Sequence, residues 1–193
     1  MEFTPKNATQ RPSIPQVDRV LAVDPSLRGT GYAVLERSVS NTQKASSGNQ
    51  VRALTWGVVR NPPNLLQSGC LVAIHERIQE LILEFTPTAA AFEAVIFVQS
   101  YKTAIVLGCA RGAALLAAAS RGLPVFEYAP RRVKQAVVGR GGAEKAQVAF
   151  MVRALLGLSE TPPADAADAL AVGLTHFQAL DRARLQVGDM EQI

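Results

Sequence analysis

Apolar and polar positions divide the chain into short alternating runs before residue 65 and longer periodic runs after it. The run RVLAVD at 19–24 is apolar and ends in an acid, TGYAVLE at 30–36 alternates, and VRALTWGVVR at 51–60 is a third strand-like run. Alternation with a period of two is typical of half-buried strands. Because no helical pattern separates these runs, we expect them to form an antiparallel meander.

After residue 65 the apolar period becomes that of a helix, which we predict to reach residue 85. Strand-like runs at 88–97 and 123–129 then alternate with helical stretches at 101–121, 130–137, 143–157 and 164–182. Strands separated by helices favour parallel pairing with helices on the faces of the sheet. The pattern therefore predicts an α/β fold: a five-stranded mixed sheet, an antiparallel meander followed by parallel strands, flanked by helices.

The length of 193 residues is that of one domain, which we place at 19–182. Residues 1–18 are polar and rich in proline and are predicted to be a flexible N-terminal tail. The polar stretch 38–50 has no periodicity and is interpreted as an insertion or a long hairpin tip, and 183–193 as a C-terminal tail.

Composition and charge indicate the cellular compartment more than they indicate the function. The net charge of +4 is mildly basic, which fits a polyanionic partner without establishing one. Cys70 and Cys109 provide neither a disulfide framework nor a paired metal motif, so both are expected to be reduced thiols. The N-terminus lacks the apolar run of a signal peptide, and no uncharged apolar stretch reaches about 18 residues. These features predict a cytoplasmic protein.

Four carboxylates occupy positions that stability alone does not explain. Asp24 ends the first strand, Glu93 lies within the apolar fourth strand, and Asp165 and Asp168 share one face of the last helix. A buried acid is costly unless it is paired, protonated or bound to a metal, and like charges on one helix face repel. One site for a hard cation such as Mg²⁺ or Mn²⁺ would explain all four acids.

Each acid also has a simpler interpretation, which stays open. Asp24 could start a turn, and Glu93 could pair with a buried arginine such as Arg111. Asp165 and Asp168 could complement the dipole at a helix N-terminus. A single shared site explains the four positions with fewer independent assumptions.

Basic residues gather between positions 130 and 148. This segment carries Arg131, Arg132, Lys134, Arg140 and Lys145 against the single acid Glu144, and its centre is the glycine-rich GRGG at 139–142. Such a loop would let backbone amides and cations approach phosphates. The alternative is an ordinary solvated helix face.

Five motifs in order then resemble a known family. DPSLRGTGYAV, the FE of AAFEAV, LGCARGA, PVFEYAPRRVKQAVVGRGGAEKAQV and ADAADALAVGLTH together resemble the RuvC family of bacterial Holliday-junction resolvases, over residues 19–176. The resemblance implies an RNase H-like fold and a homodimer that binds a four-way DNA junction. It also implies metal-dependent hydrolysis that leaves a 5′-phosphate and a 3′-hydroxyl, and a branch-migration motor as a further partner.

The resemblance assigns roles to particular residues. The family's four acidic ligands correspond to Asp24, Glu93, Asp165 and Asp168, which would hold Mg²⁺, two ions in each site, with Mn²⁺ as a substitute. The family's DNA-contacting lysines correspond to Lys134 and Lys145. Further expected DNA-binding residues are Arg111, Arg131, Arg132, Arg140 and Tyr101.

The chain departs from the family pattern near the expected DNA contacts. Ser26 replaces the glycine of DPG, Cys109 replaces a glutamine, and Ile96 stands where the family has an aromatic residue. Tyr101 or Phe97 could supply stacking on an unpaired base instead. The metal chemistry is therefore expected to persist while base contacts, and with them the preferred cleavage sequence, differ.

Two other functions stay in view. One is a junction-binding protein of the same fold that has lost its chemistry, against which the four acids argue. The other is an actin-like or sugar-kinase-type ATPase, although the chain shows no second phosphate-binding hairpin. Among the remaining residues, His75 and His176 are expected at the surface or at helix caps. Residues 113–119 could serve a dimer or an internal helix–sheet contact.

Overall fold

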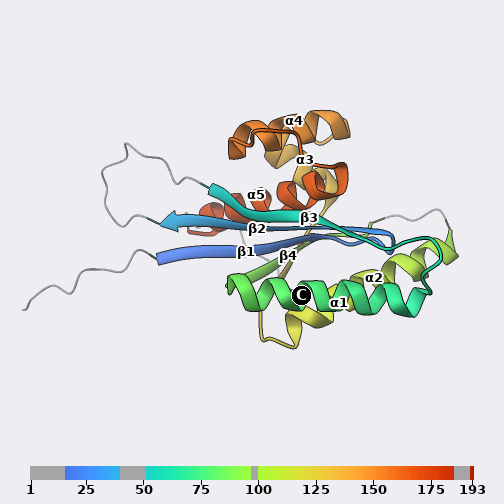
Figure 1. Cartoon of the computed structure of the whole chain (residues 1–193). Helices are drawn as coiled ribbons and strands as arrows, with labels where there is room; N and C mark the ends of the chain where they lie inside the picture. Colours follow the sequence, from blue (N-terminus) through green and yellow to red (C-terminus); the bar gives the residue numbers. More distant parts are fainter. Residues whose placement is uncertain (1–15, 40–50, 97–99, 185–191) are drawn as a thin grey trace, which may run out of the picture.

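The computed structural model describes residues 16–39, 51–96, 100–184 and 192–193. Along the chain the elements are β1 (Gln16–Asp24), β2 (Gly29–Val39), β3 (Val51–Arg60), α1 (Gln67–Phe85), β4 (Ala89–Glu93), α2 (Tyr101–Ala119), β5 (Val125–Tyr128), α3 (Pro130–Val138), α4 (Lys145–Leu156) and α5 (Ala164–Arg184). The predicted five-stranded mixed sheet flanked by helices is confirmed (Figure 1).

The strands lie in the order β3-β2-β1-β4-β5. β1, β2 and β3 pair antiparallel, whereas β4 pairs parallel with both β1 and β5. A parallel neighbour needs a crossover connection, which α1 and α2 provide. As a result the carboxyl ends of β1, β4 and β5 lie at one edge of the sheet, and Asp24 and Glu93 end neighbouring strands there.

Helices cover both faces of the sheet, α1 and α2 on one and α3, α4 and α5 on the other (Figure 1). Successive residues of β1 point to opposite faces: Leu21 and Val23 enter the core under α1 and α2, and Val20 and Ala22 enter the core under α5. All four are fully buried. The same alternation directs the next residue, Asp24, toward the α5 face.

Two glycines in β2 let α5 approach the sheet closely. A β-carbon on Gly31 would clash with the backbone carbonyl of Asp165, and one on Gly29 would lie 2.9 Å from the Asp165 Oδ2 atom. A side chain at Gly31 would therefore push the first turn of α5 outward. The pair fixes where the acids of α5 stand above the sheet.

Several element ends differ from the sequence-based boundaries. β1 begins at Gln16, so part of the predicted tail belongs to the sheet, and α5 continues to Arg184. Near the carboxyl end, Gln192 pairs with Phe126 of β5. The stretches 1–15 and 40–50, and with them most of the predicted tail and insertion, lie outside the described residues.

The fourth strand ends at Glu93 instead of continuing to residue 97. The Ala94 amide still donates to the Tyr128 carbonyl, at 2.9 Å. Beyond that point the neighbouring chains are Pro25 after β1 and Pro130 at the start of α3, and neither proline has an amide hydrogen to donate. Glu93 is therefore a strand-terminal residue, like Asp24.

Helix α2 modifies one expectation. Tyr101–Ala119 is long and apolar enough, by length and composition alone, to cross a membrane, with a mean hydropathy of 1.4 over its most apolar window. Here it packs beside α1 and carries Lys102 and Arg111. Its apolar residues Ile105 and Leu116 are exposed.

Candidate active site

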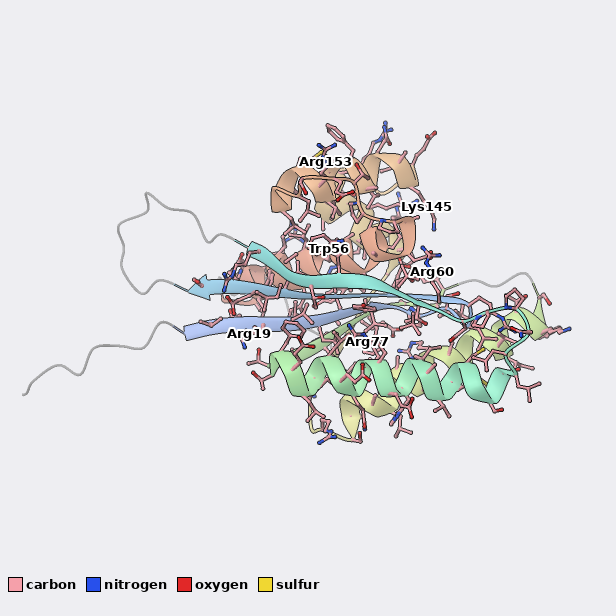
Figure 2. The ribbon with its side chains drawn as sticks, in the orientation of Figure 1. Arg19, Trp56, Arg60, Arg77, Lys145 and Arg153 are labelled. Carbon is pink, nitrogen blue, oxygen red and sulfur yellow. The ribbon has the colours of Figure 1, made fainter. Side chains whose placement is uncertain are left out.

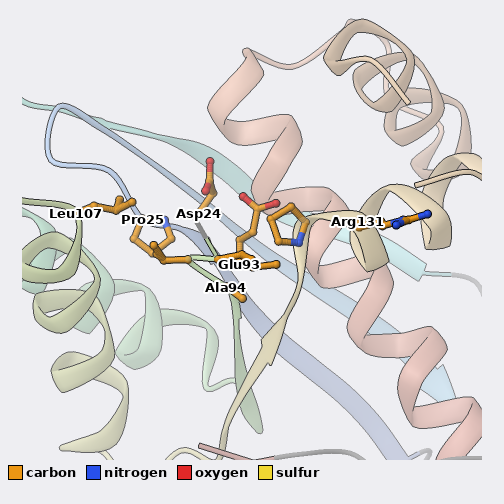
Figure 3. Close-up of a pocket in the computed structure, with 9 residues that line it drawn as sticks. Asp24, Pro25, Glu93, Ala94, Leu107 and Arg131 are labelled. Carbon is orange, nitrogen blue, oxygen red and sulfur yellow. The ribbon is translucent and has the colours of Figure 1, made fainter. Parts of the chain in front are cut away.

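Asp24 and Glu93 stand together at the carboxyl edge of the sheet. They line a cavity of about 410 Å³ with Pro25, Ala94 and Ile96 among its other walls. Figure 3 shows the two carboxylates side by side, with the Arg131 side chain directed away from them. Because each follows its strand's alternation, both acids face α5.

The surroundings disfavour the ionised form of both acids. Burial, and then the charges of Glu93 and Asp168, raise the pKa of Asp24 to about 8. Burial also raises the pKa of Glu93, although a hydrogen bond with Asp24 and the lysines Lys145 and Lys134 act in the opposite direction. The site thus holds more negative charge than it compensates and requires protons or a cation.

Helix α5 contributes its two aspartates differently. Asp168 accepts a hydrogen bond from the Lys145 ammonium at 3.1 Å, and its charge raises the pKa values of Asp24 and Glu93. Asp165 stands in the first turn of α5, beside Gly29, where a negative charge is also favoured by the helix dipole. Asp24, Glu93 and Asp168 therefore act on one another through their charges, while the Asp165 carboxylate lies over Gly29 of β2.

The donor chemistry fits a hard divalent cation. Carboxylate oxygens are the ligands that Mg²⁺ and Mn²⁺ favour, and the raised pKa values show uncompensated charge in a partly buried space. Within the described residues, no three acidic, histidine or cysteine side chains already form a closed ligand set. Asp168 is instead paired with Lys145, and the Asp165 carboxylate lies over Gly29.

The predicted basic residues separate into two groups. Lys134 and Lys145 act on the acids directly, since their charges lower the pKa of Glu93. Arg131 lines the cavity. By contrast, Arg140 donates to Gln147 at 3.1 Å, and Arg132 lies over the Tyr128 ring at 5.2 Å.

Arg111 does not pair with Glu93. Its guanidinium donates to Glu127 at 2.9 Å, which ties α2 to β5. Glu93 ends β4 on the α5 face of the sheet, whereas α2 covers the opposite face, so the register of the sheet separates the two residues. The alternative that Glu93 pairs with Arg111 is therefore wrong.

Of the two aromatic candidates for base stacking, only Tyr101 lies within the described residues. Tyr101, at the start of α2, is 92% exposed, and Ile96 lines the cavity with 66% of its surface exposed. Phe97 lies outside the described residues. Tyr101 is thus an exposed ring at the first residue of α2.

His176 was expected at the surface but is buried, with 2% of its surface exposed. Its Nδ1 atom shares a 2.8 Å hydrogen bond with the Tyr128 hydroxyl. Burial, followed by the charge of Arg37, lowers the pKa of His176 to about 4. Its spacing from the buried Val172 and Ala179 could have indicated a core position.

Gly29 and Gly31 are the site-forming residues that the sequence interpretation missed. They act by leaving room for Asp165, not by any chemistry of their own. The signal was the GTG triplet at the start of a strand, where glycine often marks a close backbone approach.

A family model described as crossover junction endodeoxyribonuclease RuvC matches residues 20–176. A protein of that name from Akkermansia muciniphila is 47% identical over 175 residues, which cover 91% of this chain and 99% of the relative. Another of the same name, from Edwardsiella ictaluri, is 45% identical over 164 residues, 85% of this chain and 89% of that protein.

Solved structures agree with the sequence relatives. T. thermophilus RuvC in complex with a Holliday junction substrate superposes with a TM-score of 0.76 at 34% identity, over 91% of this chain and 99% of that chain. The yeast mitochondrial Holliday junction resolvase has a TM-score of 0.57 at 16% identity, covering 88% of this chain and 83% of that chain, which supports the fold alone. The predicted RNase H-like fold is confirmed.

Proposed function

The chain belongs to the RuvC family of crossover junction endodeoxyribonucleases, and from this premise we propose that Asp24, Glu93, Asp165 and Asp168 hold the metal with which it resolves four-way DNA junctions. The observation that carries the assignment is that Asp24 and Glu93 end neighbouring strands and line one cavity side by side, with Asp168 and its partner Lys145 close enough to act on their charges. Excess buried negative charge is the arrangement that a divalent cation would stabilise.

Mg²⁺, two ions in each site with Mn²⁺ as a substitute, is the metal we propose. When bound, it supplies an activated water and charge stabilisation for phosphodiester hydrolysis. Asp24 and Glu93, fixed on neighbouring strands, provide rigid ligands, while Asp168 and Asp165 reach down from α5. A ligand set on three elements keeps its geometry because the packed core holds each element.

Lys134 and Lys145 have a second task in this proposal. Both lie within electrostatic reach of Glu93, so they can hold a phosphate against the acids. Lys145 extends from the first residue of α4, with 73% of its side chain exposed. It is therefore free to exchange Asp168 for a DNA phosphate. Arg131, on the cavity wall, and the exposed Tyr101, at the start of α2, are the further DNA contacts in this proposal.

A homodimer would match the two-fold symmetry of a junction and place two sites on opposed strands. Ile105, Gly108, Gly112 and Leu116 form one exposed face of α2, and the space above both glycines is open. Small residues at this spacing let a second helix approach closely. In contrast, Ala114, Ala117 and Ala118 are buried within the chain itself. We assign the dimer contact to the exposed face of α2.

We also propose that the protein acts in the cytoplasm and that a branch-migration motor is a further partner.

The test compares a synthetic four-way junction with a linear duplex of the same sequence, in Mg²⁺, in Mn²⁺ and in chelator. We expect paired, symmetric nicks on the junction alone, and only with metal. Tight junction binding without nicks, across several junction sequences, would instead indicate a binding protein. Hydrolysis of ATP without any junction binding would indicate the phosphate-hairpin ATPase class.

A further inference from the structure

We infer that Arg60 binds a phosphate of the DNA backbone on the β3 side of the acids, opposite Lys134. The inference rests on the proposed junction cleavage and adds to it a residue outside the motifs that resemble the family. Figure 2 labels Arg60 near the end of β3, at the same end of the molecule as Lys145.

The register of the sheet fixes which way Arg60 points. Arg60 pairs directly with Gly29 in the antiparallel β2–β3 ladder. Directly opposed residues of an antiparallel pair project from the same face. The β-carbon direction of Gly29 points at the Asp165 carboxylate, so the Arg60 side chain leaves the sheet on the α5 face. Trp56, four residues earlier, packs into the core under α5 and confirms this alternation.

Arg60 therefore ends a row of charges along the carboxyl edge of the sheet. From β3 to β5 the row runs Arg60, Asp165 above Gly29, Asp24, Glu93, and then Lys134 on α3. Strands lie about 4.8 Å apart, and Arg60 is two residues beyond Val58, which stands level with Asp24, so the two α-carbons are roughly 12 Å apart. That spacing suits a phosphate beside the scissile one and not the scissile phosphate itself.

Arg60 also lacks the partners that other sheet arginines have. Arg19 and Arg52 pair with Glu36, and Arg37 pairs with Asp18 and Asp181. Within the described residues, Arg60 has neither a hydrogen-bond nor an ion-pair partner for its exposed side chain. A cation that stabilises no fold contact, at the edge of an acidic site, is available for a polyanion.

The test is the salt dependence of junction binding in chelator, with Arg60→Ala and a matched control, Arg121→Ala. Arg121 is also exposed, but it precedes β5 and so lies at the opposite edge of the sheet. Loss of one phosphate contact should make the negative slope of log K against log salt shallower by about 1 and weaken binding about tenfold. The control should match the wild type, and Arg60→Lys should restore most of the slope.

If Arg60 positions the DNA, its loss should change the affinity for the junction more than the cutting rate. In Arg60→Ala, the single-turnover cutting rate at saturating protein should fall much less than the affinity. If wild type binds and cuts but Arg60→Ala and Arg60→Gln both keep its slope and affinity, the inference is wrong and the proposed function stands. If wild type neither binds nor cuts the junction, both are overturned.

Discussion

Buried acids have opposite electrostatic surroundings at the two edges of the sheet. The carboxyl edge is formed by the carboxyl ends of β1 and β4, and the far edge lies at the amino end of β1. At the far edge Glu36 receives hydrogen bonds from both Arg19 and Arg52. Burial alone would raise the pKa of Glu36, but those arginines outweigh it and lower the pKa. At the carboxyl edge no arginine among the described residues pairs with Asp24, and its pKa rises to about 8.

Arg37 is a second buried charge at the far edge that has acidic partners. Its side chain is 1% exposed and pairs with Asp18 at 3.1 Å and Asp181 at 2.7 Å. It also lies 4.8 Å from the centre of the Phe177 ring. The chain can therefore pair its buried charges where only stability matters. Uncompensated acids at the other edge indicate a site kept for a cation supplied from outside.

The largest expected effect comes from Asp24→Asn. Removing one metal ligand should reduce junction cutting by more than about a thousandfold. Junction binding should persist, and the melting temperature in chelator should not fall, because a neutral amide replaces a carboxyl whose ionised form is disfavoured by burial and by the charges of Glu93 and Asp168. Cleavage assays and thermal unfolding check this. An unfolded variant would show instead that Asp24 is structural.

His176 should give the chain a stability that depends on pH. Its pKa is about 4 when folded and 6.5 when unfolded, so between these values the unfolded chain binds more protons. The associated stability, about 3 kcal/mol, is complete above pH 6.5 and is lost as the pH falls toward 4. Denaturant unfolding across this range should show a steeper loss in the wild type than in His176→Gln. Equal slopes would contradict the assignment.

Glu36→Gln tests the far edge. It leaves Arg19 and Arg52 facing a neutral amide, which should lower the free energy of unfolding by about 2 kcal/mol. The folded variant should cut junctions at the wild-type rate, because Glu36 lies at the other edge of the sheet. A cutting defect without a stability loss would remove the distinction between the two edges.

The smallest effect is expected for Lys145→Ala. Loss of its exposed ammonium should slow cutting about tenfold. It should also make the negative slope of log K for junction binding against log salt shallower by about 1. Rate and slope measured in the same buffer check the two together. If neither changes, Lys145 serves only to pair with Asp168.

The positions of Asp24 and Glu93 at strand ends were easier to predict from the sequence than the contacts made by residues on the helices. Asp24 and Glu93 were recognisable because each interrupts an apolar run, and the period of two places both on one face. The partner of Arg111 depends on how α2 lies over β5, a long-range packing that no local pattern encodes. The position of Asp165 depends on the space above Gly29 and Gly31 for the same reason.

Calorimetric titration of Mn²⁺ into the metal-free protein tests the central claim most directly. The account predicts binding to the wild type with release of protons, at least tenfold weaker binding to Asp24→Asn and Glu93→Gln, and wild-type binding to Glu36→Gln. Absence of binding to the folded wild type, or equal weakening by Glu36→Gln, would contradict the claim that the carboxyl edge is the metal site.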